Sequence, residues 1–395
     1  ITIACSRFSG LFLRLACPAP ILQNKRRKLW QNGQVIRVIK VMEVSSDTNI
    51  GGAGKCVLTF LKTYDRSKFD VSVVLPPNSL LKAEVEKYGV PVFEVEGMAD
   101  KSLDRTAVKN LKQLFREQKP DIVHTHASMS ARFAARSLKI GIVYTRHSVF
   151  PPSPKISRGI GKKINGFINN RTSDRIIAVA EAAKDNLTAT GVNEKKITVI
   201  LNGVDRLTPL SAEEYAAARA ELNLKDGQKS AAIVARLNEV KGHKYLVRAA
   251  KMVLDSGIDA KFFIAGTGET EEAIRRQIRD EGLQDNVIML GFITDVRPLM
   301  NVMDVQLNCS FGTEATSLSL LEGMSLGKPA VVTDFGGNPG VIQDGRNGFL
   351  VPTHDARAMA DALIKLFRDD ALYEKMREQA FAIYQEKFTS EVNTR

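Results

Sequence analysis

Short apolar runs alternate with amphipathic, helix-like segments along most of this 395-residue chain. After a first run at 35–44, the runs of the first half lie at 69–75, 90–95, 121–125, 141–145, 175–179 and 197–201. Those of the second half lie at 230–235, 260–265, 286–290, 304–308, 329–333 and 348–351. Such alternation is typical of parallel strands joined by crossover helices. It predicts an α/β protein with two doubly wound, Rossmann-like domains, residues 35–205 and 206–388.

Ligands of open α/β sheets bind beyond the carboxyl ends of the strands, so two such domains facing each other predict a site in a central cleft. Residues 1–34 depart from the pattern. Their weak apolar patch at 9–16 precedes the basic run 25–28, the reverse of a signal peptide, and residue 1 is not Met. We expect 1–34 to be a non-native or disordered extension, and the helical pattern that stops at Arg395 to be truncated.

Composition narrows the class of protein. A hydrophobic fraction of 44% and a charged fraction of 25% are typical of a soluble globular protein, and no apolar run is long enough to predict a membrane-spanning helix. The four cysteines form no Cys-x-x-Cys pair, which argues against a zinc–cysteine site or a disulfide scaffold and fits a reducing cytosol. The net charge of +12 divides into +6 for residues 1–34, +10 for 35–205 and −4 for the remainder. The basic first half therefore predicts an anionic partner: nucleic acid, an anionic membrane surface or a lipid diphosphate.

Two glutamates, Glu314 and Glu322, flank the start of a predicted helix. An apolar run ends at Asn308, a polar loop carries Glu314, and the helix is expected from about Thr316 to Gly327. Free amides at a helix start favour anions, whereas carboxylates suit neutral hydroxyls such as those of a sugar and a ribose. The combination favours a nucleotide-sugar pocket, although the spacing alone also fits two ordinary exposed glutamates.

Two cations, Arg236 and Lys241, lie at the next predicted strand–helix junction. Arg236 follows the run 230–235, and Lys241 precedes a helix. Fixed cations in such a place would neutralise a departing diphosphate. The alternative is a pair of solvated surface charges.

The glycines at 51–54 follow the first predicted strand and open a helix. They could let the backbone approach a phosphate closely, or they could form a plain tight turn. A P-loop is excluded because Asn49 and Cys56 occupy its Gly and Ser/Thr positions. A dinucleotide fingerprint at Gly266-Thr-Gly268 is excluded because Glu271 replaces the third glycine, which disfavours a nicotinamide dehydrogenase.

Histidines end two neighbouring strands of the first domain. His124 and His126 close the run 121–125, and His147 follows the run 141–145. At these ends they would point into the cleft and could donate hydrogen bonds to a sugar or a phosphate. A His-x-His spacing can hold a metal, but no carboxylate or cysteine partner is expected nearby, so structure or substrate is favoured over metal.

The segment 155–171 is basic and amphipathic. Its apolar residues recur at helical spacing, namely Ile156, Ile160, Ile164, Phe167 and Ile168. We expect this apolar face to pack on the core. The basic face, which includes Lys162 and Lys163, offers a second use as a contact with anionic lipid headgroups.

Further motifs follow the two glutamates: Gly327-Lys328-Pro329, the apolar run 330–333 and Gly336-Gly337-Asn338-Pro339. With Arg-Leu-x-x-x-Lys-Gly at 236–242, they make residues 35–390 resemble the retaining GT-B glycosyltransferases of family four, or glycosyl transferases group 1, of the polysaccharide-biosynthesis type. The family usually has Gly-Phe or Gly-Leu where this chain has Ala-Thr-Ser at 315–317. The sugar preference is therefore left open.

The resemblance implies a role for each matching residue. Glu314 would contact the transferred sugar, Glu322 the ribose hydroxyls, and Arg236 and Lys241 the departing diphosphate. Together with His147, which would lie near the primary hydroxyl of the sugar, Glu314, Arg236 and Lys241 form the predicted catalytic set. The predicted donor-binding residues are Glu322, the amides of Thr316, Ser317, Leu318 and Ser319, the glycines Gly51, Gly52 and Gly268, and Phe292 and Ile293 around the base. His126, Lys162 and Lys163 are assigned to the acceptor side.

The resemblance implies a retaining hexosyltransferase that needs no metal and no cofactor and takes a UDP-sugar or GDP-sugar. Its acceptor would be a glycan or a lipid-linked glycan in cell-envelope polysaccharide synthesis, its location cytoplasmic and peripheral on the inner face of the plasma membrane, and nucleic acid no partner. In this family the final helix returns to the first domain. The alternatives are a GT-B nucleotide-sugar epimerase, a small-molecule glycosyltransferase or, from charge alone, a nucleic-acid binder.

Overall fold

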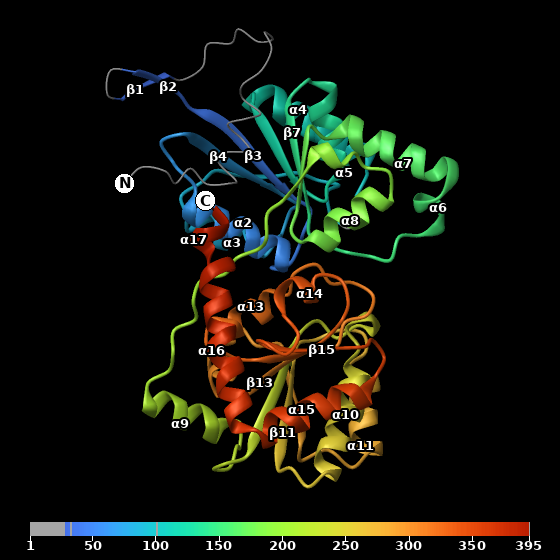
Figure 1. Ribbon diagram of the computed structural model, residues 1–395. Helices are drawn as coiled ribbons and strands as arrows, with labels where there is room; N and C mark the ends of the chain where they lie inside the picture. The colour runs from blue at the N-terminus through green and yellow to red at the C-terminus, as the bar shows by residue number, and fades with distance from the viewer. Residues whose placement is uncertain (1–27, 32–33, 100–101, 395) are drawn as a thin grey trace. The chain divides into compact units, whose positions relative to one another are not determined.

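The computed structural model describes residues 28–31, 34–99 and 102–394, which form two compact units (Figure 1). Unit 1 contains the described residues up to His147, Pro152–Asn202 and those from Ser390 onward. Unit 2 contains Ser148–Pro151 and Gly203–Thr389. The segment 1–34, predicted to be an extension, lies outside the described residues except for 28–31 and 34.

Unit 1 is built on a seven-stranded parallel sheet in the order β5-β4-β3-β6-β7-β8-β9. The strands are β3 (Ile39–Ser45), β4 (Phe69–Leu75), β5 (Val92–Glu94), β6 (Ile122–His126), β7 (Gly141–Arg146), β8 (Arg175–Ala178) and β9 (Ile197–Val199). The helices are α2 (Gly52–Thr63), α3 (Leu81–Glu86), α4 (Arg105–Gln118), α5 (Met129–Ser137), α6 (Pro154–Ser157), α7 (Gly159–Thr172), α8 (Glu181–Ala189), the 3-10 turn η1 (Glu194–Lys196) and α17 (Ser390–Thr394).

Alternate residues of β3 enter two different cores of unit 1. Val41 packs with α2 and α3 on one face of the sheet, and Met42 packs with α4 and α5 on the other. A parallel strand buried on both faces is mostly apolar, which is why such strands appear in the sequence as nearly continuous apolar runs.

The first strand is shorter than the predicted run 35–44. β2 (Gln34–Arg37) pairs antiparallel with β1 (Lys28–Gln31), and only β3 enters the parallel sheet. Asp121 contacts both sides of the break: its side chain accepts a hydrogen bond from the Lys40 amide and pairs with the exposed Arg37 guanidinium at 3.1 Å. The prediction of a single buried strand over 35–44 is therefore wrong before residue 39.

Unit 2 repeats the architecture with six parallel strands in the order β12-β11-β10-β13-β14-β15. The strands are β10 (Lys229–Val234), β11 (Ala260–Ala265), β12 (Val287–Gly291), β13 (Val305–Asn308), β14 (Ala330–Thr333) and β15 (Gly348–Val351). The helices are α9 (Ala212–Glu221), η2 (Glu239–Lys241), α10 (His243–Asp255), α11 (Glu271–Asp280), α12 (Arg297–Val302), α13 (Leu318–Met324), α14 (Asn338–Val341), α15 (Ala356–Arg368) and α16 (Asp370–Lys387).

Polar side chains set several helix starts in both units. The carboxylate of Asp104 accepts bonds from the first amides of α4, and Asp355 does the same for α15. Ser211 and Glu214 form a reciprocal capping box at the start of α9. Such caps satisfy amides that have no partner inside the helix, so the sequence itself marks where these helices begin.

Each sheet has one switch point, where the order of the strands reverses. In unit 1 the first parallel strand, β3, lies between β4 and β6, and in unit 2 β10 lies between β11 and β13. The crevice beyond the carboxyl ends at such a point is the usual ligand position in doubly wound folds. The loops that follow the β3/β6 and β10/β13 pairs are therefore the expected positions of bound ligands.

The predicted fold class, two Rossmann-like α/β domains with parallel sheets, is confirmed, and the predicted apolar runs correspond to the strands of the two sheets. Among the described residues, none of the helices combines the length and the apolar character that crossing a membrane requires.

Candidate active site

Glu314 and Lys241 form a largely buried ion pair beyond the β10/β13 switch point. The Lys241 ammonium lies 2.7 Å from Glu314 Oε2, and their side chains are 18% and 8% exposed. The same oxygen accepts hydrogen bonds from the Asn308 amide at 2.9 Å and the Ser310 hydroxyl at 3.0 Å. Lys241 also donates to the Thr313 carbonyl at 3.2 Å. The structure thus brings together two of the predicted catalytic residues.

Glycines hold the Glu314 loop in place by permitting backbone contacts. A Cβ built on Gly337 would lie 1.3 Å from the Ala315 carbonyl oxygen, and one on Gly336 would lie 2.1 Å from that of Glu314. On the other side, Gly242 has a φ of +69°, and its Cβ would meet the Cys309 carbonyl at 2.2 Å. Only glycine tolerates such approach, so the Gly-Gly turn and Gly242 fix the loop between them.

Arg236 follows β10 and is exposed. The backbone around it rests on the loop after β11, because the Leu237 amide donates to the Thr267 carbonyl at 2.9 Å. A Cβ on Gly268 would lie 2.1 Å from the Leu237 carbonyl oxygen. The packing of these two loops by itself requires glycine at 268, and the predicted role of Gly268 in donor binding stays a prediction.

Glu322 lies in α13, a short helix with Ser317 at its N-cap. It is 9% exposed and shares the helix with Gly323, whose hydrogen faces the Gln306 side chain of β13. The Ser319 hydroxyl donates to the Val234 carbonyl at the end of β10, at 3.1 Å. The segment 316–319 is therefore anchored to the same strand end that precedes Arg236.

The predicted base-binding residues lie apart from this group. Phe292 follows β12, at the edge of the sheet, and two strands separate β12 from β13. Phe292 is 72% exposed, whereas Ile293 packs against the apolar cluster of unit 2 around Phe263. Of the two, only Phe292 presents an apolar ring to its surroundings.

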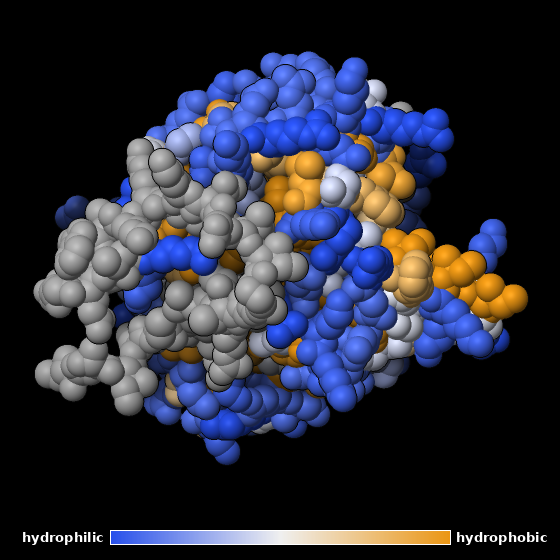
Figure 2. All heavy atoms as spheres, turned by 90° about the horizontal axis from the view of Figure 1, so that it is seen from above, coloured by the Kyte–Doolittle hydropathy of each residue, from blue (hydrophilic) through white to orange (hydrophobic). Residues whose placement is uncertain are grey.

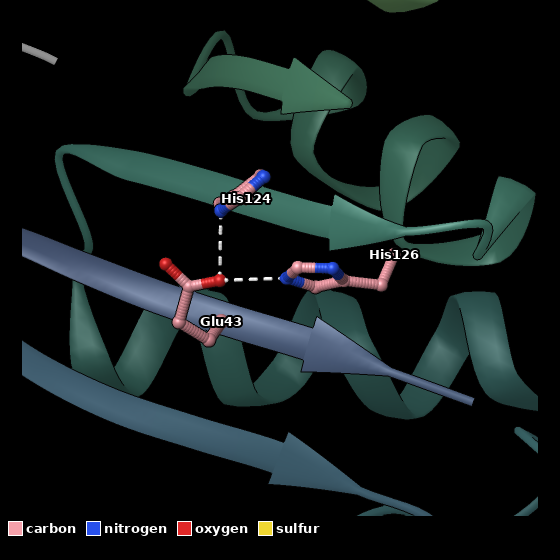
Figure 3. A group of neighbouring side chains, drawn as sticks. All are labelled: Glu43, His124 and His126. Atoms are coloured by element: carbon pink, nitrogen blue, oxygen red, sulfur yellow. Dashed lines mark hydrogen bonds and ion pairs between the residues drawn. The ribbon is translucent and has the colours of Figure 1, made fainter. Parts of the chain in front are cut away.

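The histidines of unit 1 form a chain with a carboxylate that the sequence interpretation missed (Figure 3). Glu43 Oε2 lies 2.8 Å from His124 Nδ1 and 3.0 Å from His126 Nε2. His126 Nδ1 lies 2.7 Å from His147 Nε2, and His124 Nε2 lies 2.7 Å from the Thr145 hydroxyl. The expectation that no carboxylate accompanies these histidines is wrong.

Strand pairing explains the error. Glu43 on β3 is the register partner of His124 on β6, so residues 81 positions apart in the chain lie side by side. The available signal was a single acidic residue inside the otherwise apolar run 41–44. A charge in a buried strand requires a partner, and only the sheet order shows which one.

These groups have shifted pKa values. Burial by itself raises the pKa of Glu43, but the charges and hydrogen bonds of His124 and His126 outweigh it and lower that pKa to about 2. Burial and then the neighbouring His124 lower the pKa of His126. Burial, His126 and His124 hold the pKa of His147 well below its ordinary value. At neutral pH the group is therefore a carboxylate with neutral imidazoles at 126 and 147.

Gly51 is the N-cap of α2 and has an ordinary extended backbone, with φ of −93°. A Cβ built there would meet no atom within 4 Å. Neither conformation nor packing requires glycine at 51, while its amide donates to the Asn49 carbonyl at 3.1 Å, as in a tight turn, so the turn and ligand alternatives both stand. Close approach by a ligand is a use of this position that remains.

Helix α7 contradicts the expectation that its apolar face packs on the core. Phe167 is 70% exposed and Ile160 is 76% exposed. The buried face carries instead Gly166, which lies against the Gly191 backbone, and Asn169, whose side-chain oxygen accepts a bond from Arg132 at 2.9 Å. A small residue and a polar contact occupy the interface, and this leaves Ile160, Ile164 and Phe167 exposed.

Comparison with known proteins supplies two family models. One, described as Glycosyl transferases group 1, matches residues 214–382, and one described as Glycosyltransferase Family 4 matches residues 50–206. The UDP-Gal:alpha-D-GlcNAc-diphosphoundecaprenol alpha-1,3-galactosyltransferase of Escherichia coli is 26% identical over 354 residues, which cover 85% of this chain and 89% of that protein. The N-acetyl-alpha-D-glucosaminyl L-malate synthase of Bacillus anthracis is 27% identical over 299 residues, covering 73% and 76%.

A solved structure also resembles this chain. The Anabaena protein HepE, crystallised with UDP and glucose, matches with a TM-score of 0.79 and 21% identity over 90% of this chain and 97% of that one. At this level of identity the likeness shows a shared fold.

Proposed function

This chain belongs to the family 4, group 1 glycosyltransferases, and we propose that it moves a sugar from a nucleoside diphosphate sugar to a glycan or lipid-linked acceptor. The family resemblance seen in the sequence is confirmed, and the chain is a glycosyltransferase. Two of its relatives support the acceptor class and the donor class by name: the Escherichia coli enzyme uses UDP-Gal and a diphosphoundecaprenol acceptor, and HepE binds UDP.

The observation that carries the proposal is the environment of Glu314. Its Oε2 is occupied by an ammonium, an amide and a hydroxyl, and none of these bonds uses Oε1. Oε1 can then accept a hydrogen bond from a hydroxyl of the transferred sugar. The Lys241 ammonium has three N–H groups and uses two within the chain, on Glu314 and the Thr313 carbonyl, so the third can meet a diphosphate oxygen.

The same environment supports retention without a protein nucleophile. Glu314 Oε2, which is held by three donors, is a weak nucleophile because its lone pairs are already engaged, and Oε1 is assigned here to a hydroxyl of the sugar. In the proposed step the bond from the anomeric carbon to the phosphate oxygen breaks. The acceptor oxygen attacks from the same face, and its proton passes to the departing phosphate. Lys241 and Arg236 stabilise the charge that develops on the diphosphate, which makes a metal ion at this step unnecessary.

The test is thermal-shift screening of the chain with UDP, GDP and ADP and their common sugars. A ligand that binds the native state raises the melting temperature by mass action. We expect one nucleotide series to do so, and the shift to disappear in Glu322→Ala. A folded sample that responds to none of them would contradict the proposed donor site.

The exposed side of α7 supports a peripheral membrane location. Four large apolar side chains of α6 and α7 are exposed to between 41% and 76%: Ile156, Ile160, Ile164 and Phe167. Figure 2 shows apolar atoms gathered at its right-hand edge, which is the side on which α6 and α7 lie in Figure 1. Lys162 and Lys163 lie among them on the same helix. Apolar side chains flanked by cations fit the interface of an anionic bilayer, where a lipid-linked acceptor would be presented.

Vesicle sedimentation tests this location. The chain should bind vesicles that contain phosphatidylglycerol more strongly than neutral vesicles, and the double variant Ile160→Ser/Phe167→Ser should lose most of that binding. Leu80→Ser is the matched control, since Leu80 is a 62% exposed apolar residue elsewhere in unit 1. Equal loss in the control, or none in the double variant, would contradict membrane docking through α7.

A further inference from the structure

Glu43, His124 and His126 direct one potential ligand atom each toward a common point on one face of the unit 1 sheet (Figure 3). Residues two apart on a strand share a face, so both histidines of β6 project to the side where Glu43 projects from β3. The three atoms are Glu43 Oε2, His124 Nδ1 and His126 Nε2, all within 4.8 Å of one another. The side chains are between 1% and 5% exposed.

The geometry points to a divalent metal site of the zinc class at Glu43, His124 and His126. Two imidazoles and one carboxylate are a recurrent ligand set for zinc, which accepts nitrogen and oxygen ligands at about 2.0–2.2 Å. Ligands at those bond lengths in a tetrahedron lie roughly 3.3 Å apart. Here the oxygen is 2.8 and 3.0 Å from the two nitrogens. A retreat of the carboxylate by about half an ångström would bring both oxygen–nitrogen separations to about that value.

The second oxygen of Glu43 provides an independent reason. Oε1 is buried and has no hydrogen-bond partner among the described residues. A buried charged oxygen without a partner is costly, and buried charges in proteins are paired or bind metal ions. A cation held by both carboxylate oxygens would satisfy Oε1 and add the fourth ligand contact.

The outer contacts of both histidines also suit a metal. A ligating imidazole must be free of hydrogen on the metal side and normally donates its other N–H to a neighbouring acceptor. His124 Nε2 has the Thr145 hydroxyl at 2.7 Å, and His126 Nδ1 has His147 Nε2 at 2.7 Å. Both neighbours can accept, so the proton arrangement that a metal requires is already available.

A bound cation would change which ring nitrogen of His147 carries the proton. The functional consequence rests on the proposed role of His147 near the sugar. With the carboxylate alone, His126 donates to Glu43, and its Nδ1 then accepts a hydrogen bond from His147 Nε2. With the cation, His126 donates to His147 Nε2 instead, and the proton of His147 moves to Nδ1. Metal loading would therefore convert Nδ1 of His147 from an acceptor into a donor.

This site departs from the expectation that the chain holds no metal. For His124 and His126 the sequence favoured structure or substrate over metal. A separate expectation was that sugar transfer needs no metal at the diphosphate, for which Lys241 and Arg236 of unit 2 are proposed. The cation proposed here lies in unit 1 and takes no part in departure of the nucleotide.

The test uses the full chain, dialysed first against a chelator and then against a limited concentration of Zn²⁺, followed by elemental analysis. We expect Glu43→Gln and His126→Gln to bind one equivalent less than the unaltered chain. His147→Gln, which removes an outer partner, should weaken binding by roughly 10- to 100-fold. His354→Gln is the control, because His354 is an exposed histidine whose hydrogen bond is to Tyr245 in unit 2. Equal zinc in the folded Glu43→Gln protein would overturn the site.

A spectroscopic measurement covers the case in which the variants do not fold. X-ray absorption at the zinc edge of the loaded, unaltered chain should show two imidazole nitrogens and carboxylate oxygen, with no sulfur. Sulfur ligands, an all-oxygen shell, or no retained zinc would each overturn the proposal. None of these outcomes depends on nucleotide binding, so failure here leaves the donor-site test untouched, and the converse also holds.

Discussion

Each unit holds a buried carboxylate near the switch point of its sheet and satisfies it in a different way. Glu43 lies within β3, beside β6, and contacts imidazoles, while Glu314 lies in the segment after β13 and is paired with an ammonium. A carboxylate paired with Lys241 carries its own counter-charge and supplies a cation for a diphosphate. Among the described residues Glu43 forms ion-pair contacts only with imidazoles, which suits either a hydrogen-bond relay or a metal ion.

The largest expected effect is the loss of the ammonium in unit 2. Lys241→Ala should reduce turnover by about 100- to 1,000-fold, as expected when one preorganised group facing a developing negative charge is removed. Steady-state kinetics with the donor identified by thermal shift measures this. The matched control is Lys244→Ala, since Lys244 lies three residues on and pairs with Glu239 at the surface. A Lys241→Ala enzyme with normal turnover would remove the basis for the donor-site assignment.

Alanine substitution of a glycine in unit 2 and of one in unit 1 should change the stability of the protein by very different amounts. Gly337→Ala forces a methyl group into the Ala315 carbonyl and should destabilise the chain by on the order of 3 kcal/mol. Gly51→Ala meets open space and should change stability by less than about 0.5 kcal/mol. Urea unfolding compares the two. Loss of turnover in a fully stable Gly51→Ala protein would support ligand approach at that backbone, whereas full activity would favour an incidental glycine.

Acid should destabilise unit 2 through His243. Burial, reinforced by the charge of Lys241, lowers the pKa of His243 from 6.5 to about 4. The His243 imidazole therefore binds a proton below about pH 6.5 in the unfolded chain, but only below about pH 4 in the folded chain. The free energy of unfolding is unaffected by protonation of His243 above about pH 6.5 and falls by up to about 3 kcal/mol as the pH drops to 4.

The variant His243→Leu isolates this contribution. Neither ring nitrogen of His243 has a hydrogen-bond partner among the described residues, so leucine removes no bond. Urea midpoints at pH 7.5 and 4.5 should show a smaller acid loss in His243→Leu than in the unaltered chain or in His354→Gln. An equal loss in all three proteins would contradict the assigned shift.

The smallest expected change in stability is at Arg236. Its side chain is exposed and has no ion-pair partner among the described residues, so Arg236→Ala should alter the unfolding free energy by less than about 0.5 kcal/mol. Its turnover should nevertheless fall, although less than in Lys241→Ala, because an exposed cation is screened by solvent. Arg248→Ala, which removes an exposed arginine of α10, serves as the control and should keep its turnover.

The sequence predicted unit 2 better than unit 1, for a physical reason. Lys241 and Glu314 each stand in the segment that joins a buried strand to the following α-helix, and such segments after adjacent parallel strands meet at one edge. The partnership of Glu43 with His126 needs the order of the strands, which no local pattern contains. For α7 the spacing revealed an apolar face, but the contacts of Gly166 and Asn169 decided which face is buried.

The most direct measurement follows release of nucleoside diphosphate from the stabilising nucleotide sugar in the presence of a lipid-linked glycan acceptor. It compares the unaltered chain with Glu314→Gln and with Glu272→Gln, an exposed glutamate of α11. The donor-site account predicts that the unaltered chain and Glu272→Gln release nucleotide at similar rates, while folded Glu314→Gln has lost turnover. Release by Glu314→Gln at the rate of the unaltered chain would contradict it.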